Sequence, residues 1–207
     1  TKAARGVLPE TSDTVGYVPP EIYIKNPSTS TITTTLDLTT CFNSQLVVGT
    51  GGTQDIDVGF DLTDNKTFSL VKCISGASCY EEFISPLMET NKFKRMGKTT
   101  GSIGTGASIA YNGSVITLGD GTTGTEDRFN IALDAISINT FRQKEGFCDI
   151  IKYTGDGDIN RVINHTLNKD VGSIMVIPLS EANDLYNVFW FKGMTSKQYI
   201  SHTGIVE

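Results

Sequence analysis

The sequence predicts an all-β fold, a jelly-roll-like β-sandwich, and three observations predict it. From Thr31 onward, runs of β-branched and aromatic residues alternate with Gly, Asn and Asp, a pattern typical of short strands joined by turns. Glycine occurs 21 times and threonine is frequent, and both residue types are poor in helix interiors. Hydrophobic residues make up 38% and charged residues 19% of the chain, which is the balance of a folded globular domain.

Short strands are expected along the whole chain after the first thirty residues. The expected strands are residues 31–38, 45–49, 55–60, 68–74, 108–110, 114–118, 129–138, 148–153, 160–164, 173–178 and 187–192. Asn112-Gly113 predicts a two-residue hairpin turn, because both residue types tolerate positive φ. Helix is expected only as single turns, at residues 79–88 and at residues 180–186.

Two stretches of the chain, residues 46–73 and 150–177, follow one pattern. Each begins with an apolar pair and a Thr-Gly turn, passes a polar tip, and ends in a strand-like apolar run. Internal repetition indicates a repeated structural unit. The sequence therefore predicts two related β-units, at about residues 46–88 and 146–194, within one β-domain that covers residues 31–207.

The first thirty residues predict an extended N-terminal arm. Proline fixes φ and removes a backbone donor, so a proline-rich stretch with few large apolar residues does not predict packed sheet. Residues 21–25 are a candidate edge strand within this arm. Two alternatives stay open: an arm that lies on a neighbouring subunit, and a disordered tail. The prolines of this stretch are Pro9, Pro19, Pro20 and Pro27.

Charge and hydropathy exclude two partner classes. The formal net charge of −6 argues against a general nucleic-acid coat, because phosphate binding depends on Lys and Arg. The apolar runs fall far short of the ~20 residues that a membrane-spanning helix needs. A basic cluster has two interpretations, a solvated strand or loop face and a docking site for an acidic partner surface. Its members are Lys92, Lys94, Arg95 and Lys98.

The four cysteines are expected to be buried, reduced thiols, because a chain of 207 residues does not need disulfide staples. They are Cys41, Cys73, Cys79 and Cys148. A bridge between Cys73 and Cys79 is the alternative, since it would close only a small loop. No C-x-x-C pair occurs, and the two histidines are far apart in sequence, so the sequence predicts no zinc site.

The sequence predicts no enzyme and no cofactor, because each candidate motif is incomplete. The only bases with a pKa near neutrality are His165 and His202, and neither belongs to a recognisable triad. The turn at residues 156–160 begins like a calcium loop, but Leu167 stands where a bidentate acid is required. A weak ion site and a tight polar turn remain alternatives there. His165 and this turn differ between the two repeats, which indicates duplicated architecture rather than duplicated chemistry.

Trp190 lies in an aromatic run near the end of the second repeat, between Phe189 and Phe191. In a strand, alternation puts Trp190 on one face and its two neighbours on the other. One interpretation is core packing on both faces. The other makes Trp190 a contact residue for a glycan or for another subunit.

Residues 146–157, followed by residues 163–167 and 174–177, resemble the pattern G-F-S-I-V-x-Y-T-G-N-G … H-G-L-G … I-I-V-K. This pattern recurs in β-rich proteins of tailed bacteriophages, particularly marine ones, which are often labelled tail-fibre or virion structural proteins. The chain departs from it where Thr166 follows His165 in place of glycine. No catalytic residue is attached to the pattern, so none is carried over.

The resemblance implies a structural protein of a tailed-phage particle, assembled in the host bacterial cytoplasm and located in the virion. Its partners would be further copies of itself and other virion proteins, and its place would be a tail fibre or tail tip, or the capsid as a decoration or cement subunit. One alternative is a lectin-like module that binds host-surface glycans through residues 99–108 and Trp190. A less favoured alternative is a polysaccharide depolymerase.

Overall fold

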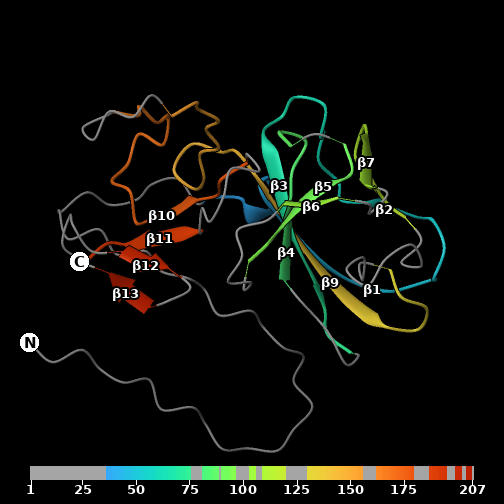
Figure 1. Ribbon diagram of the computed structural model, residues 1–207. Helices are drawn as coiled ribbons and strands as arrows, with labels where there is room; N and C mark the ends of the chain where they lie inside the picture. Colours follow the sequence, from blue (N-terminus) through green and yellow to red (C-terminus); the bar gives the residue numbers. More distant parts are fainter. Residues whose placement is uncertain are drawn as a thin grey trace, which may run out of the picture. The chain divides into compact units, whose positions relative to one another are not determined.

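The computed structural model describes residues 36–75, 81–88, 90–96, 103–105, 109–119, 130–155, 162–179, 187–194, 199–201 and 204–206. The chain divides into two units, residues 1–35 and residues 36–207, and all described residues belong to the second. The described residues form antiparallel β-sheets, with one short 3₁₀ turn at Leu38–Thr40 (Figure 1). The predicted all-β class is confirmed.

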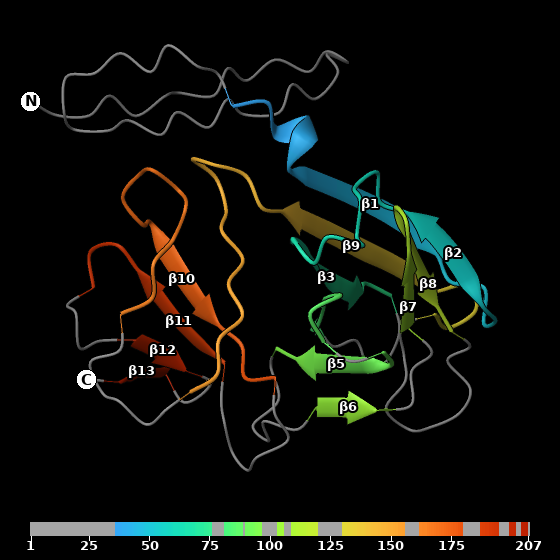
Figure 2. The same cartoon turned by 90° about the horizontal axis from the view of Figure 1, so that it is seen from above.

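The largest sheet has six antiparallel strands, and its centre is formed by strands that are distant in sequence. β9 lies between β1 and β3, and a meander then runs from β3 to β6 (Figure 2). In sheet order the strands are β1 (Phe42–Val48), β9 (Ala135–Arg142), β3 (Thr67–Cys73), β4 (Glu81–Ile84), β5 (Lys92–Arg95) and β6 (Ile103–Thr105).

Two smaller antiparallel sheets complete the described strands. The three-stranded sheet consists of β2 (Gln54–Asp57), β8 (Val115–Leu118) and β7 (Ile109–Asn112), in that order. The four-stranded sheet consists of β10 (Ser173–Val176), β11 (Val188–Phe191), β12 (Tyr199–Ser201) and β13 (Gly204–Val206). The strands expected at 45–49, 55–60, 68–74, 108–110, 114–118, 129–138, 173–178 and 187–192 overlap β1, β2, β3, β7, β8, β9, β10 and β11.

The hydrophobic core draws on both the six-stranded and the three-stranded sheet. Alternate residues of β9, Ile136 and Ile138, point to the same cluster as Val71 of β3 and as Ile116 and Leu118 of β8. Each of these five side chains is at most 1% exposed. The cluster buries residues from 56 to 138, so the described residues after β9 contribute nothing to it.

The hairpin predicted at Asn112-Gly113 is confirmed, with its turn displaced by one residue. Asn112 pairs with Val115 at the end of β7, so Gly113 and Ser114 form the turn. Gly113 has φ +57°, the left-handed region that glycine enters without a steric penalty. The residue type thus marked the hairpin correctly, although Asn112 belongs to the strand.

Four element predictions are wrong in their described residues: the helical turn at 79–88 and the strands at 31–38, where a 3₁₀ turn begins at Leu38, at 148–153 and at 160–164. The helical turn expected at residues 79–88 is in its described part a strand, β4. The strand expected at residues 148–153 has no ladder beyond one isolated bridge at Cys148. The Asp149 carboxylate accepts the N–H groups of Ile150 (3.0 Å) and of Thr166 (2.5 Å), which lies seventeen residues later, so a side chain replaces a neighbouring strand.

In their described parts, the two predicted repeats share only their terminal strand, which is β3 in the first and β10 in the second. Residues 46–73 run through the end of β1, all of β2 and all of β3. Within residues 150–177, the described part holds only β10, and the strand expected at 160–164 is irregular over its described residues, 162–164. The arm at residues 1–30 and the turn at residues 180–186 lie outside the described residues.

The end of β1 is held against the start of β9 by a buried amide. Asn130 is fully buried, its Oδ1 accepts the Thr50 N–H (2.8 Å), and its Nδ2 donates to the Gly52 carbonyl. Gly49 donates its N–H to the Asp134 carbonyl (2.8 Å), and a β-carbon at Gly49 would lie 2.0 Å from the Ile131 carbonyl oxygen. This close approach of two backbones requires glycine at position 49.

Gly49→Ala should therefore lower the free energy of unfolding by about 1–3 kcal/mol, the usual cost of forcing extra volume into a packed site. Gly52→Ala is the matched control, because nothing lies within 4 Å of a β-carbon at Gly52. Urea denaturation of the two variants measures the difference. Equal stabilities would contradict the close approach of residue 49 to Ile131.

Candidate functional site

The face of the six-stranded sheet that points away from the core carries a row of phenylalanines across four strands. Ring centroids lie 5.1 Å apart for Phe42 and Phe141, 4.8 Å for Phe141 and Phe68, and 5.4 Å for Phe68 and Phe83. Phe147, just after β9, adds a further contact to Phe141 at 6.5 Å. Such pairs contribute about 0.5–1.5 kcal/mol each beyond their burial, so this row ties β1, β9, β3 and β4 together.

Beyond the aromatic row, the far end of this face and the turn before β9 carry exposed apolar side chains, which we call the apolar corner. Its members are Leu46 (69% exposed), Val48 (60%), Ile74 (58%) and Leu133 (87%). Ile74 donates its N–H to the Ala135 carbonyl (2.7 Å), and Ala135 pairs with Val48, so Ile74 and Val48 flank β9. Leu133 donates its N–H to the Gly49 carbonyl (2.9 Å), which places it beside the end of β1.

Leu133 is strained as well as exposed. Its φ of +68° lies in the left-handed region, which costs a residue with a β-carbon about 1–2 kcal/mol. Glycine or asparagine would fit this turn with less strain and without placing an apolar side chain in water. Local strain that brings no packing within the chain is typical of contact and functional positions. The apolar corner is therefore the strongest candidate site among the described residues.

A second set of exposed apolar side chains lies on irregular extended segments. Residues 151–155 and 162–166 have no regular secondary structure, and every one of them is exposed. The first segment carries Ile151 and Tyr153, and the second carries Val162 and Ile163. Thr166, in the second segment, donates its N–H and its hydroxyl to the carboxylate of Asp149, which lies just before the first segment. Extended chain of this kind buries little surface on its own.

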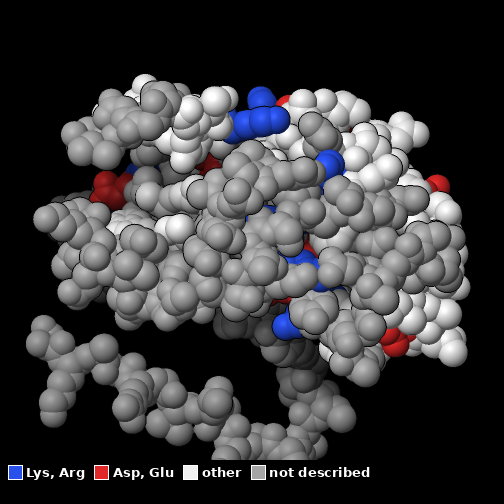
Figure 3. All heavy atoms as spheres, viewed as in Figure 1, with Lys and Arg blue, Asp and Glu red and all other residues white. Residues whose placement is uncertain are grey.

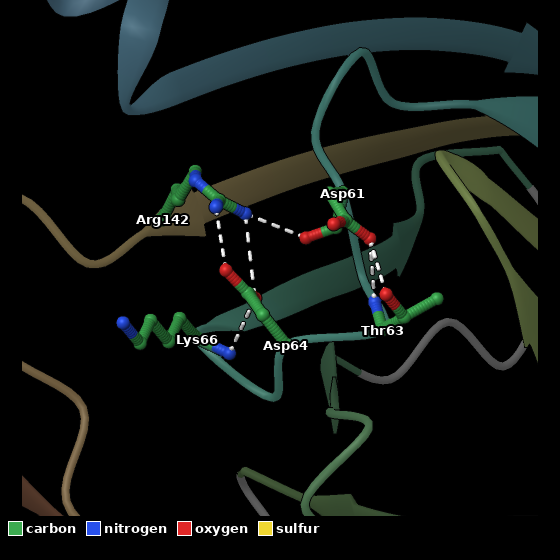
Figure 4. A network of polar contacts seen from close by, with 5 residues as sticks. All are labelled: Asp61, Thr63, Asp64, Lys66 and Arg142. Atoms are coloured by element: carbon green, nitrogen blue, oxygen red, sulfur yellow. Dashed lines mark hydrogen bonds and ion pairs between the residues drawn. The ribbon is translucent and has the colours of Figure 1, made fainter.

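The charged groups near β9 are used structurally (Figure 4). Arg142 donates to the Asp64 carboxylate (Nη2–Oδ2 2.6 Å) and to the Asp61 carbonyl (2.5 Å), and so fastens the loop after β2 to the end of β9. The hydroxyl and the N–H of Thr63 donate to the Asp61 carboxylate and hold its pKa below the usual range. These acids are engaged in turns and ion pairs rather than aimed at a ligand.

The predicted basic cluster does not form a solvated face. Lys94 is 1% and Arg95 7% exposed, so the interpretation as a solvated face is wrong for these two residues, while docking of the cluster to an acidic partner stays a prediction. Arg95 pairs with Glu82 (Nε–Oε1 3.0 Å) and lies over the Phe93 ring, and desolvation lowers the pKa of Lys94. Lys92 is half-buried, and Lys98 lies outside the described residues. On the face in Figure 3, the described charged side chains are scattered rather than gathered in one patch.

Trp190 lies in β11 and pairs with Ile174 of the neighbouring β10. Its side chain is half-buried, while Ile174 is 47% exposed. The structure therefore places Trp190 on a partly covered sheet face, and its predicted contact with a glycan or another subunit stays a prediction.

The described ranges hold no cluster of metal-ligating side chains, because no group of three His, Cys, Asp or Glu side chains there could hold a metal ion. The exposed His165 uses its Nδ1 to accept the Leu167 N–H (3.3 Å), a turn interaction. Burial, together with the nearby Asp149 and Cys41, raises the pKa of the Cys148 thiol to about 11, so it is a poor nucleophile at neutral pH. His202, Cys79 and the turn at residues 156–160 lie outside the described residues.

Comparison of the chain with protein families, curated proteins and solved structures finds no match. In the described part of the chain, no helix is long and apolar enough to cross a membrane. The candidate site therefore has to be judged on its own geometry. Sequence reasoning missed the apolar corner, although the alternation of Phe42, Ser44, Leu46 and Val48 in β1 was a readable signal for one apolar face.

Arg142→Met should lower the free energy of unfolding by about 1–2 kcal/mol, because it leaves the Asp61 carbonyl and the Asp64 carboxylate without their charged donor in a site about three-quarters buried. Lys192→Met removes the same type of charge from an ion pair with Asp170 that is 58% and 86% exposed, and should cost less than about 0.5 kcal/mol. Thermal or urea unfolding distinguishes them. A similar, small effect of both would show that the Arg142 network adds little.

Proposed function

We propose that this chain is a non-enzymatic structural subunit of a tailed-bacteriophage particle, which self-assembles and docks to other virion proteins. Within the virion it would serve as a tail-fibre or tail-tip component, or as a capsid decoration or cement subunit. The resemblance of residues 146–177 to phage structural proteins gives the biological setting. The observation that carries the proposed self-assembly is the apolar corner, four large side chains that are 58–87% exposed at one end of one sheet.

Physical chemistry favours a protein partner for that corner. Burying apolar surface contributes about 25 cal/mol per Å², and contiguous apolar patches on soluble proteins mark interaction sites. The corner consists of Leu46, Val48, Ile74 and Leu133, with hydrogen-bonded backbone between them. The carboxylate of Asp134, beside Leu133, accepts the Cys73 thiol (3.4 Å).

The extended segments support the same proposal. Residues 151–155 and 162–166 expose Ile151, Tyr153, Val162 and Ile163 without a sheet of their own. Ordering extended chain costs about 1–2 kcal/mol per residue in conformational entropy, which burial against a neighbour offsets. Segments of this type are expected where subunits interlock.

For the fold, we propose that the six-stranded and three-stranded sheets pack as a β-sandwich, since one core cluster takes residues from both. The jelly-roll-like connection has less support, because β3 to β6 form a meander, whereas a jelly roll is built from two Greek keys. The lectin-like alternative rests on Trp190, which is half-buried, and on residues 99–108, of which the structure describes residues 103–105.

The purified chain should form a homo-oligomer at micromolar concentration, because the exposed apolar side chains gain burial only in contact with another molecule. Sedimentation velocity over a hundredfold range of concentration measures the mass. A strict monomer at every concentration would contradict self-assembly. Binding on a glycan array by that monomer would favour the lectin-like alternative instead.

A further inference from the structure

We propose that the free edge of β1 pairs with β1 of a second copy of this chain, antiparallel and about a two-fold axis near Gln45. The two six-stranded sheets would then join into one continuous sheet. This inference rests on the proposed self-assembly and names the surface through which it would occur. The apolar corner would extend along the junction of the two copies.

The hydrogen-bonding pattern of β1 shows which of its backbone groups face away from β9. β1 is the terminal strand of its sheet, and its described neighbour is β9 alone. Gly49 donates to the Asp134 carbonyl, and Arg142 donates to the Cys41 carbonyl, so the odd-numbered residues face β9. Because an antiparallel strand directs successive backbone groups to opposite sides, the even-numbered residues direct N–H and C=O to the free edge.

Among the described residues, that edge of β1 pairs with no strand, and only Gln54 Nε2 bonds to it, at the Val48 carbonyl (3.3 Å). Soluble proteins guard exposed strand edges with charges, proline or bulges. β1 has the sequence FNSQLVV, without a charged residue or proline over seven residues. The terminal strand of the three-stranded sheet, β2, has the sequence QDID, and its Asp55 and Asp57 are both exposed. The edge strand β2 thus carries two carboxylates, whereas the edge strand β1 carries no charge.

The outer edge of β1 is complementary to the same edge of a second copy. Antiparallel pairing about Gln45 places Leu46 opposite Ser44 of the second copy and Val48 opposite its Phe42, so the outward backbone groups of Ser44 and Leu46 find partners. The Val48 carbonyl, which accepts from Gln54 Nε2 (3.3 Å) in the single chain, would exchange that bond for one to the second copy. All four side chains involved are uncharged. With a net charge of −6 on each copy, contact through an uncharged strand avoids bringing like charges together.

The ends of β1 match in the same arrangement. Leu36 and Leu38, just before β1, are 37% and 41% exposed, and Val48 and Leu133 are exposed at its other end. Antiparallel pairing brings the first end of one copy beside the second end of the other. Apolar side chains therefore meet apolar side chains at both ends of the paired strands, in keeping with an isologous two-fold contact.

The test compares two lysine substitutions in the full chain. Leu46→Lys puts a charge on the edge strand, and pairing would bring two symmetry-related lysines close together, so self-association should weaken by about tenfold or more. Ile174→Lys is the matched control, because Ile174 is an exposed apolar strand residue (47%) that lies in β10, in another sheet and outside the apolar corner. It should leave the association constant within about twofold. Sedimentation equilibrium gives the constants, and thermal unfolding checks that both variants fold.

Amide hydrogen exchange gives an independent readout. The Ser44 and Leu46 amides face the free edge, so their exchange should slow as the wild-type concentration rises, while exchange at Gln45, which faces β9, should not change.

Equal weakening by both lysine variants would overturn edge pairing, because Ile174 lies in a different sheet from β1. An oligomer that neither variant affects would also overturn it, and would leave the proposed self-assembly intact. A wild-type chain that stays monomeric would overturn both.

Discussion

The buried Asn130 side chain fixes the geometry on which the rest of the described structure depends. By bonding the turn after β1, it sets where β1 ends relative to the start of β9, and the absence of a side chain at Gly49 allows the two backbones to meet. Strand register has a period of two, so a slip of one residue would exchange the two faces of β1. The core contact of Val47 and the exposure of Leu46 are thus two results of one constraint.

That register also decides which residues of the six-stranded sheet enter the core and which lie on its outward face. Inward residues of β9 and β3 enter the core shared with the three-stranded sheet, whereas outward residues form the phenylalanine row. The row is continuous over four strands and stops before the apolar corner, where Leu46 and Val48 take the outward positions of β1. Stability is therefore concentrated at one end of the outward face, and the other end is left for contact with another molecule.

The sequence allowed the strands with clear punctuation to be predicted, such as β3 and β8, because alternation and nearby turn residues agree there. It could not reveal that Asp149 replaces a neighbouring strand, since that depends on Thr166 seventeen residues later. Nor could it show that Lys94 and Arg95 are buried: a basic strand looks like a solvated one until Glu82 and Phe93 are placed beside it. Alternation in β1 indicates two faces but not which of them is covered.

Leu133 connects the fixing of the register to the proposed assembly. The turn that precedes β9 forces a left-handed backbone at this position, and its N–H closes the turn onto the Gly49 carbonyl. In the isolated chain, the 87% exposed leucine adds strain and offers little packing in return. In an assembly, the same rigid turn would present that side chain at a defined place beside the end of β1. Rigid presentation lowers the entropy lost on association, so a cost to the single chain becomes an advantage for contact between copies.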